Sequence, residues 1–211
     1  MTSLSRRAFV TASTAALLTG CGGGHGTAPA ANSTTKQGSS NQGGATPSAS
    51  PAVRPVHALA RSVPVTLRVP AIGVDTPVMQ LGLASDGTVQ VPPITAHDRA
   101  GWYRYSPTPG RTGPSVILGH VTVGAYGDGV FRHLARLRAG DRIDAVLENG
   151  TTATFTVTAV RTVAKADFPS DEVYGNVDRP ELRLITCGGT RTGTGYLDNV
   201  IVFAALTAAS P

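Results

Sequence analysis

Short runs in which apolar and polar residues alternate, with glycine and proline between them, most constrain the fold of this chain. Val65, Leu67 and Val69 alternate with polar neighbours before Pro70, a pattern typical of a strand with one buried face. By the same reasoning, strands are expected at 65–69, 74–81, 115–119, 142–147, 151–160, 181–186 and 200–204. Strands at this spacing predict an all-β fold that is closed, or nearly closed, into a barrel.

Two local signals add detail to this expectation. Asn149-Gly150 lies between two expected strands and predicts a type I′ hairpin turn, because both residues tolerate positive φ. Apolar residues three apart over 131–137 predict a short helix with one buried face. The fold is therefore expected to be mainly β with short helices.

The N-terminus carries an export signature. The pair Arg6-Arg7 precedes an apolar position, and a short apolar run leads into Leu18-Thr19-Gly20-Cys21. The first part resembles a twin-arginine export signal. The second resembles a bacterial lipobox, which is cleaved before the cysteine that then carries the lipid. We expect residues 1–21 to be an export signal, with a diacylated Cys21 holding the protein at the membrane. The alternative is a plain secretory signal with an incidental cysteine.

Composition divides the remaining chain into two parts. Residues 22–60 are mainly Gly, Ser, Ala, Thr, Asn, Gln and Pro, with almost no large apolar residues, which predicts a disordered tether. Residues 61–211, about 150 residues, suit one domain with one core. The formal net charge of +5 fits a location near anionic lipid or wall polymer. We expect no nucleic-acid partner, because aromatic residues are few and no basic cluster is dense.

Cys187 is the only cysteine outside the predicted signal and lipobox, 1–21. Outside the cytoplasm such a thiol has no internal partner, so it is either inert and buried or kept for its reactivity. It ends an alternating run, and Gly188 and Gly189 leave open space beside the sulfur. This setting favours a nucleophile over a packing residue.

His120 and Arg191 are the other candidate site residues. His120 follows an apolar run and a glycine, a position that suits either a catalytic imidazole or an edge histidine held by a backbone carbonyl. Arg191 is the only arginine after Cys187. It is either a solvated loop charge or a donor to substrate. The spacings of His97, His120, His133 and Cys187 match no compact ligand set, and the acidic residues are dispersed, so we expect no metal and no cofactor.

Together these segments resemble the sortases, the cysteine transpeptidases of Gram-positive envelopes. The Leu-x-Thr-Cys run at 184–187 is the most specific mark. The Thr-Cys-Gly-Gly form, the Gly119-His120 pair and the Gly-Tyr-x-Asp-Asn-Val-x-Val run at 195–202 look most like class F sortases of actinobacteria. Further matching stretches are Leu67–Val74, Gly101-Trp102-Tyr103, Gly140-Asp141-Arg142 and Phe168-Pro169 leading to Val173-Tyr174-Gly175.

The resemblance covers about 63–204 and implies the eight-stranded sortase β-barrel. It also implies a His-Cys-Arg triad on His120, Cys187 and Arg191. Many sortases place the arginine at the start of the last strand, where this chain has Leu197-Asp198-Asn199, and Arg191 is matched by counting back from that run. A lipobox instead of a transmembrane helix is a second departure from the usual arrangement.

The activity implied is cleavage of a C-terminal sorting motif of the Leu-Pro-x-Thr-Gly type on secreted proteins. The acyl group would pass to an amine of the cell wall or of a pilin subunit. Cys187 would attack, His120 would transfer protons, and Arg191 would stabilise the oxyanion. Two alternatives stay open from the residues alone. One is a lipid-anchored module that binds a sorting peptide or wall polymer without catalysis, and the other is a cysteine peptidase that only hydrolyses.

Overall fold

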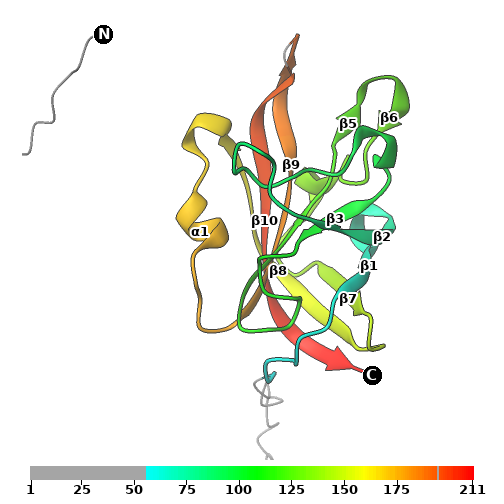
Figure 1. The fold of residues 1–211 in the computed structure, drawn as a ribbon, viewed down its shortest axis with the longest axis vertical. Coiled ribbons are helices and arrows are strands. Elements are labelled where there is room, and N and C mark those ends of the chain that lie inside the picture. Colours follow the sequence, from blue (N-terminus) through cyan, green and yellow to red (C-terminus); the bar gives the residue numbers. More distant parts are fainter. Residues whose placement is uncertain (1–55, 194) are drawn as a thin grey trace, which may run out of the picture. The chain divides into compact units, whose positions relative to one another are not determined.

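The structure is a computed structural model, and it describes residues 56–193 and 195–211 (Figure 1). The predicted export signal, the lipobox with Cys21 and nearly all of the predicted tether lie outside the described residues. No helix in the described part of the chain is both long and apolar enough to cross a bilayer.

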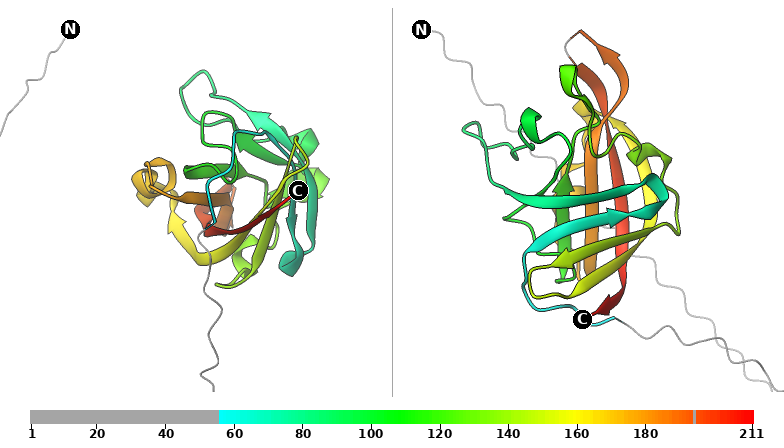
Figure 2. Two further views of the ribbon diagram at one scale, coloured as in Figure 1. Left: turned by 90° about the horizontal axis from the view of Figure 1, so that it is seen from below. Right: turned by 90° about the vertical axis from the view of Figure 1, so that its right-hand side faces the viewer.

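Eight strands close into a barrel in the order β1-β2-β3-β4-β9-β10-β8-β7 (Figures 1 and 2). The β2–β3 and β4–β9 pairs are parallel, and the other neighbours are antiparallel. This confirms the expected all-β barrel with short helices. The bounds are β1 Pro64–Val69, β2 Val74–Leu81, β3 Ala100–Tyr103, β4 Gly113–Leu118, β7 Arg142–Leu147, β8 Thr152–Ala164, β9 Pro180–Thr192 and β10 Gly195–Ser210.

The remaining elements are short. A two-stranded sheet is formed by β5 (Thr122–Val123) and β6 (Gly127–Asp128), and α1 is a single five-residue helix, Ser170–Tyr174. The 3₁₀ turns are Pro70–Ile72, Ile94–Ala96, Gly124–Tyr126, Leu134–Arg136 and Lys165–Asp167.

The helix predicted over 131–137 is wrong in extent, because only the 3₁₀ turn Leu134–Arg136 forms there. The backbone N–H of Phe131 donates to the His120 carbonyl at 2.9 Å, and the chain is extended again at Leu137. The three apolar residues that suggested a helix face are nonetheless buried in the core. The spacing therefore identified buried positions correctly, but the local backbone hydrogen bonds are the three-residue bonds of tight turns, such as Leu134 to Phe131 and Leu137 to Leu134, so no α-helix forms.

The Asn149-Gly150 turn also differs from its prediction. The N–H of Leu147 donates to the Thr151 carbonyl, and the N–H of Gly150 donates to the Leu147 carbonyl. Three residues, 148–150, therefore form the loop, and Gly150 takes φ 86° at its last position. This is the pattern of a three-residue hairpin with a left-handed glycine, not of a two-residue type I′ turn.

Strand alternation gives the sheet two buried faces. On β9, Leu182 and Leu184 point into the main core inside the barrel, whereas Ile185 belongs to a second cluster on the outer face. The outer cluster is completed by Leu81, Val116, Leu118, Val173 and Ile201. Val173 comes from α1, which lies against this outer side of the sheet (Figure 1). The outer face of β4, β9 and β10 is therefore partly covered, and the candidate site lies on it.

Candidate active site

Cys187 lies on β9 and is half-buried with a free thiol. The expectation that it ends its strand is wrong, because β9 continues to Thr192. Because side chains alternate along a strand, Cys187 shares the outer face with Ile185, two residues earlier. The thiol is thus placed on the partly covered face of the sheet and not inside the barrel core.

The parallel pairing of β4 with β9 leads the chain to His120. Leu118 and Ile185 are the last pair of these strands, and His120 and Cys187 each follow it by two residues, with His120 just beyond the end of β4. Two hydrogen bonds keep the strands in register up to this point. The N–H of Gly119 donates to the Ile185 carbonyl at 3.1 Å, and the Thr186 hydroxyl donates to the Gly119 carbonyl at 2.7 Å.

The His120 ring is oriented by a group that the sequence did not reveal. Its Nε2 lies 2.6 Å from the carbonyl oxygen of Pro92. A carbonyl only accepts, so Nε2 carries the proton and Nδ1 is left as the nitrogen for proton exchange. The carbonyl-held histidine that the sequence left as an alternative is therefore present, and it is compatible with an acid–base role. Pro92 is 28 residues upstream in an irregular segment, and no sequence pattern links it to His120.

Arg191 follows a break in the pairing of β9 with β10. Asp198 pairs with Gly188 and Tyr196 pairs with Arg191, so β9 carries one extra residue between these pairs. Gly189 has φ 70° at this bulge, and a Cβ there would collide with the Asp198 carboxylate. Arg191 faces Tyr196 and Cys187 faces Asn199, and residues that face each other in this way share a side of the sheet. Tyr196 and Asn199 are three residues apart on β10, so they lie on opposite sides. The register therefore places the exposed Arg191 side chain on the other face from Cys187.

The hairpin end that carries Arg191 projects beyond the barrel, away from the C-terminus (Figures 1 and 2). Its position is supported by a 2.7 Å hydrogen bond between the hydroxyls of Tyr196 and Thr122, which links β10 to β5. Cys187 and Tyr196 both line a pocket of about 310 Å³ at this end of the barrel. The other lining residues include Val121, Phe131, Arg132, Thr186, Gly188 and Val200.

A larger aromatic pocket, about 550 Å³, lies beside the outer hydrophobic cluster. Tyr103 and Phe168, which line it, pack against the outer hydrophobic cluster. Tyr174 of α1 is a third wall, and burial, with a smaller effect of Tyr103, raises its pKa above the ordinary value. This pocket can take apolar parts of a bound chain, and its wall depends on how α1 is held.

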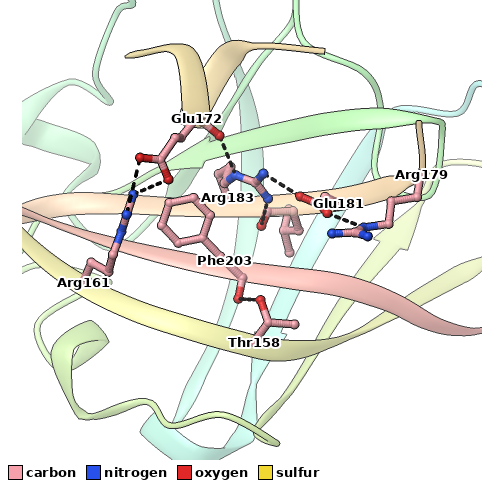
Figure 3. A network of polar contacts seen from close by, with 8 residues as sticks. Thr158, Arg161, Glu172, Arg179, Glu181, Arg183 and Phe203 are labelled. Carbon is pink, nitrogen blue, oxygen red and sulfur yellow. Dashed lines mark hydrogen bonds and ion pairs between the residues drawn. The ribbon is translucent and has the colours of Figure 1, made fainter. Parts of the chain in front are cut away.

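A network of charged residues fastens α1 to the outer face (Figure 3). Arg161 donates to both carboxylate oxygens of Glu172, at 3.4 and 2.8 Å, and the Nε of Arg183 donates to the Glu172 main-chain carbonyl at 3.3 Å. The ring of Phe203 lies between the two guanidinium groups, with each Cζ 4.6 Å from its centroid.

Glu181 compensates the charge of the buried Arg183. The exposed fractions of the two residues are 7% and 3%, so neither charge is solvated. Glu181 accepts hydrogen bonds of 2.5 Å from Arg183 and from Arg179. Burial raises the pKa of Glu181, but the hydrogen bonds and positive charge of Arg183 and Arg179 outweigh it and leave the pKa below its usual value.

Among the described residues, no group of three or more His, Cys, Asp or Glu side chains is arranged to hold a metal ion. The ring centroids of His97 and Tyr126 are 5.5 Å apart. The main-chain carbonyl of His97 accepts a hydrogen bond from the Val130 N–H. It belongs to the packing beside β5 and β6 and is not gathered with Cys187.

The family model of the Sortase domain matches residues 67–207, so the chain belongs to the sortase family. Solved sortase structures share its fold. The SrtA sortase of Actinomyces oris is 26% identical, with a TM-score of 0.54 over 76% of this chain and 89% of that chain. Sortase A of Corynebacterium diphtheriae is 20% identical, with a TM-score of 0.54 over 72% and 64% respectively.

Sortase C-1 of Actinomyces oris is 20% identical, with a TM-score of 0.53 over 68% of this chain and 73% of that chain. A comparison with curated proteins gives no match. The family and the fold predicted from the sequence are thus confirmed, and they support a transpeptidase role. The class F assignment stays a prediction.

The charge network generates a prediction about stability. Glu181→Gln leaves the buried Arg183 without its counter-charge. The free energy of unfolding at pH 7 should therefore fall by about 3 kcal/mol. The pKa of Glu181 is depressed in the folded state, so its contribution is full above the ordinary carboxyl pKa of about 4.3 and is lost as the pH falls below it. Urea unfolding at pH 7 and pH 3 should show the two proteins converging in acid.

Asp75→Asn is the matched control. It removes the acid of an exposed 3.4 Å pair with Arg68, and the expected change is within about 1 kcal/mol. Equal stability of Glu181→Gln and the unaltered protein at pH 7 would contradict the proposed importance of the buried pair.

Proposed function

We propose that this chain is a cysteine transpeptidase of the class F sortase type, acting on the outer face of the bacterial cell membrane. One observation supports the proposal: within a sortase domain, β4 pairs in parallel with β9 as far as Leu118 and Ile185, and His120 and Cys187 each follow this pair by two residues. An imidazole next to a solitary thiol is the pairing that nucleophilic catalysis by cysteine requires. Arg191, from the same family pattern, is proposed as a third member.

The chemistry is an acyl transfer in two balanced steps. The Cys187 thiolate attacks the carbonyl carbon of the scissile peptide bond, and the carbonyl oxygen takes the negative charge. The C–N bond then breaks, and the protonated His120 gives its proton to the leaving amine. In the second step an incoming amine attacks the thioester, His120 takes its proton, and the Cys187 thiolate leaves.

The proposed substrate is a C-terminal sorting motif of the Leu-Pro-x-Thr-Gly type on a secreted protein, and the acceptor is an amine of the cell wall or of a pilin subunit. The outer face supports this choice, since it offers apolar residues beside Cys187 and a larger aromatic pocket lined by Tyr103 and Phe168. An extended peptide with apolar side chains suits such a surface. No metal or other cofactor takes part in these steps.

The proposed anchor is a lipid on Cys21. The support is the lipobox-like run 18–21 after a short apolar stretch. Mass analysis of the N-terminal peptide from native membranes should show a cleaved, diacylated Cys21. Finding residues 1–20 still attached to the membrane-bound protein would contradict this anchor.

The main test of the proposed function uses a panel of sorting-motif peptides with an added amine such as triglycine. The unaltered protein should form a thioester on Cys187 and release the amine adduct. Cys187→Ala should lose both, because no other thiol lies in the described part of the chain. Mass spectrometry of protein and peptide products follows both steps.

Two results would favour the other functions. Hydrolysed peptide without any adduct, even at high amine concentration, would identify a cysteine peptidase. Peptide binding without thioester or product would identify a binding module. Asp75→Asn again serves as a control variant, because this exposed residue lies on β2 and pairs with Arg68.

Arg191 is proposed to donate to the oxyanion, and its removal tests this. Arg191→Ala should lower the rate of thioester formation by about 10²–10³, the usual cost of one oxyanion donor. Arg191→Lys should remain impaired by about tenfold or more, since lysine keeps the charge and loses the planar fork. Arg68→Ala, an exposed arginine on β1, is the control. A near-normal Arg191→Ala rate would remove Arg191 from the mechanism.

A further inference from the structure

Asn199 lies directly opposite Cys187 in the antiparallel pairing of β10 with β9. Residues that face each other in this way project from the same side of the sheet, with Cβ atoms about 4.5–5.5 Å apart. On its other side Asn199 pairs with Val163 of β8. One row across the outer face therefore runs from Cys187 through Asn199 to Val163, and His120 follows the end of β4 on the other side of β9.

The Asn199 side chain is available to a ligand. It is half-buried, and within residues 56–193 and 195–211 no hydrogen bond of its amide group is present. Its neighbours on this face are apolar, with Ile201 two residues along the strand and Val163 across from it. When a substrate covers this face, water is displaced from the amide, and an unpaired polar group there is costly. The bound chain must therefore supply a hydrogen-bond acceptor.

We infer that Asn199 is a catalytic residue whose side-chain N–H donates to the carbonyl oxygen that Cys187 attacks. The inference rests on the proposed function, because it assigns a role within that acyl transfer. A tetrahedral carbon bonded to sulfur holds its oxygen close to the thiol, within reach of an amide that starts from the neighbouring strand. Donors aimed at this oxygen lower the barrier because negative charge develops there as the C–S bond forms.

The arrangement gives Cys187 a different group on each flank. His120, on the β4 side, transfers protons, and Asn199, on the β10 side, donates a hydrogen bond to the oxyanion. Arg191 is on the opposite face according to the strand register, so it reaches the oxyanion only after the hairpin end changes conformation. Asn199 needs no such change. An oxyanion accepts more than one hydrogen bond, so both donors are compatible.

The test compares two reactions of the same thiol in the full-length protein. Acylation by p-nitrophenyl acetate passes through an oxyanion and is followed by release of p-nitrophenolate. Alkylation by iodoacetamide is a displacement at carbon with no oxyanion, so it reports only on the thiol. The variants are Asn199→Leu, which is similar in size, and Asn199→Ala, and both remove the donor without adding a charge beside the thiol. Asn149→Asp, in the β7–β8 turn, is the control asparagine.

The expected result is a selective loss. Acylation by p-nitrophenyl acetate should fall by about tenfold or more, and thioester formation with a sorting-motif peptide by about 10²–10³ with little change in KM. Alkylation should stay within about twofold, as the thiol itself is unaltered, and so should the Asn149→Asp control in all three reactions. A merely structural role of Asn199 would instead slow alkylation as well or lower the thermal midpoint.

The outcomes separate the two proposals. If neither Asn199 variant slows acylation by p-nitrophenyl acetate more than it slows alkylation, the role of Asn199 is overturned, whatever the peptide result. If the unaltered protein fails to process the peptides but the variants lose ester acylation selectively, the role stands and the proposed substrate is wrong. If Cys187 of the unaltered protein is alkylated but never acylated by either reagent, both proposals fall.

Discussion

The parallel pairing of β4 with β9 is the constraint on which the site depends. In parallel strands both chains advance in the same direction, so the segments that carry Cys187 and His120 leave the Leu118–Ile185 pair side by side. The bonds from Gly119 and Thr186 continue this register past the end of β4. If β4 ran antiparallel to β9, the residue two beyond Leu118 would instead lie beside Arg183, four residues before Cys187. The buried rows that hold β4 and β9 in the barrel therefore also bring the segment of His120 towards that of Cys187.

Alternation along the strands then decides which side chains accompany the thiol. Leu182 and Leu184 lie inside the barrel, and Ile185 lies on the outer face. Cys187, two residues after Ile185, lies on the same outer face. A single extra residue at the Gly189 bulge reverses this alternation for the hairpin end. Bulges are known to redirect side chains beside active sites. Here the consequence is that a group close to Cys187 in sequence, Arg191, is not close to it in register, while Asn199 is.

The sequence was sufficient for much of the fold. Alternation located β2 and β7 at their observed bounds, and the helix-like spacing at 131–137 identified buried residues even though no helix forms. It could not reveal contacts made by irregular backbone. The Pro92 carbonyl that holds His120 has no side-chain signature, and the bulge that displaces Arg191 depends on a count of residues on two strands at once.

The candidate thiol and imidazole were accessible to sequence reasoning because each follows an apolar run that had to be a strand. Asn199 was not, because the run at 195–202 marks it only as part of a family pattern and assigns no role to its side chain. Its proximity to Cys187 exists only once β9 and β10 are paired in register. Hydrophobic periodicity fixes which face of a strand is buried, but the residue-by-residue pairing of two strands depends also on the turn and on bulges between them.

The attachment of α1 has a consequence for how this protein can diverge. Arg183 binds the helix through the main-chain carbonyl of Glu172, a group that every residue type possesses. Only the second attachment, the ion pair with Arg161, needs a carboxylate at that position. Replacing the side chain at 172 therefore removes the ion pair and leaves the hydrogen bond from Arg183. The helix that walls the aromatic pocket can thus exchange residues, and with them the shape of the pocket, while its attachment to the barrel is retained.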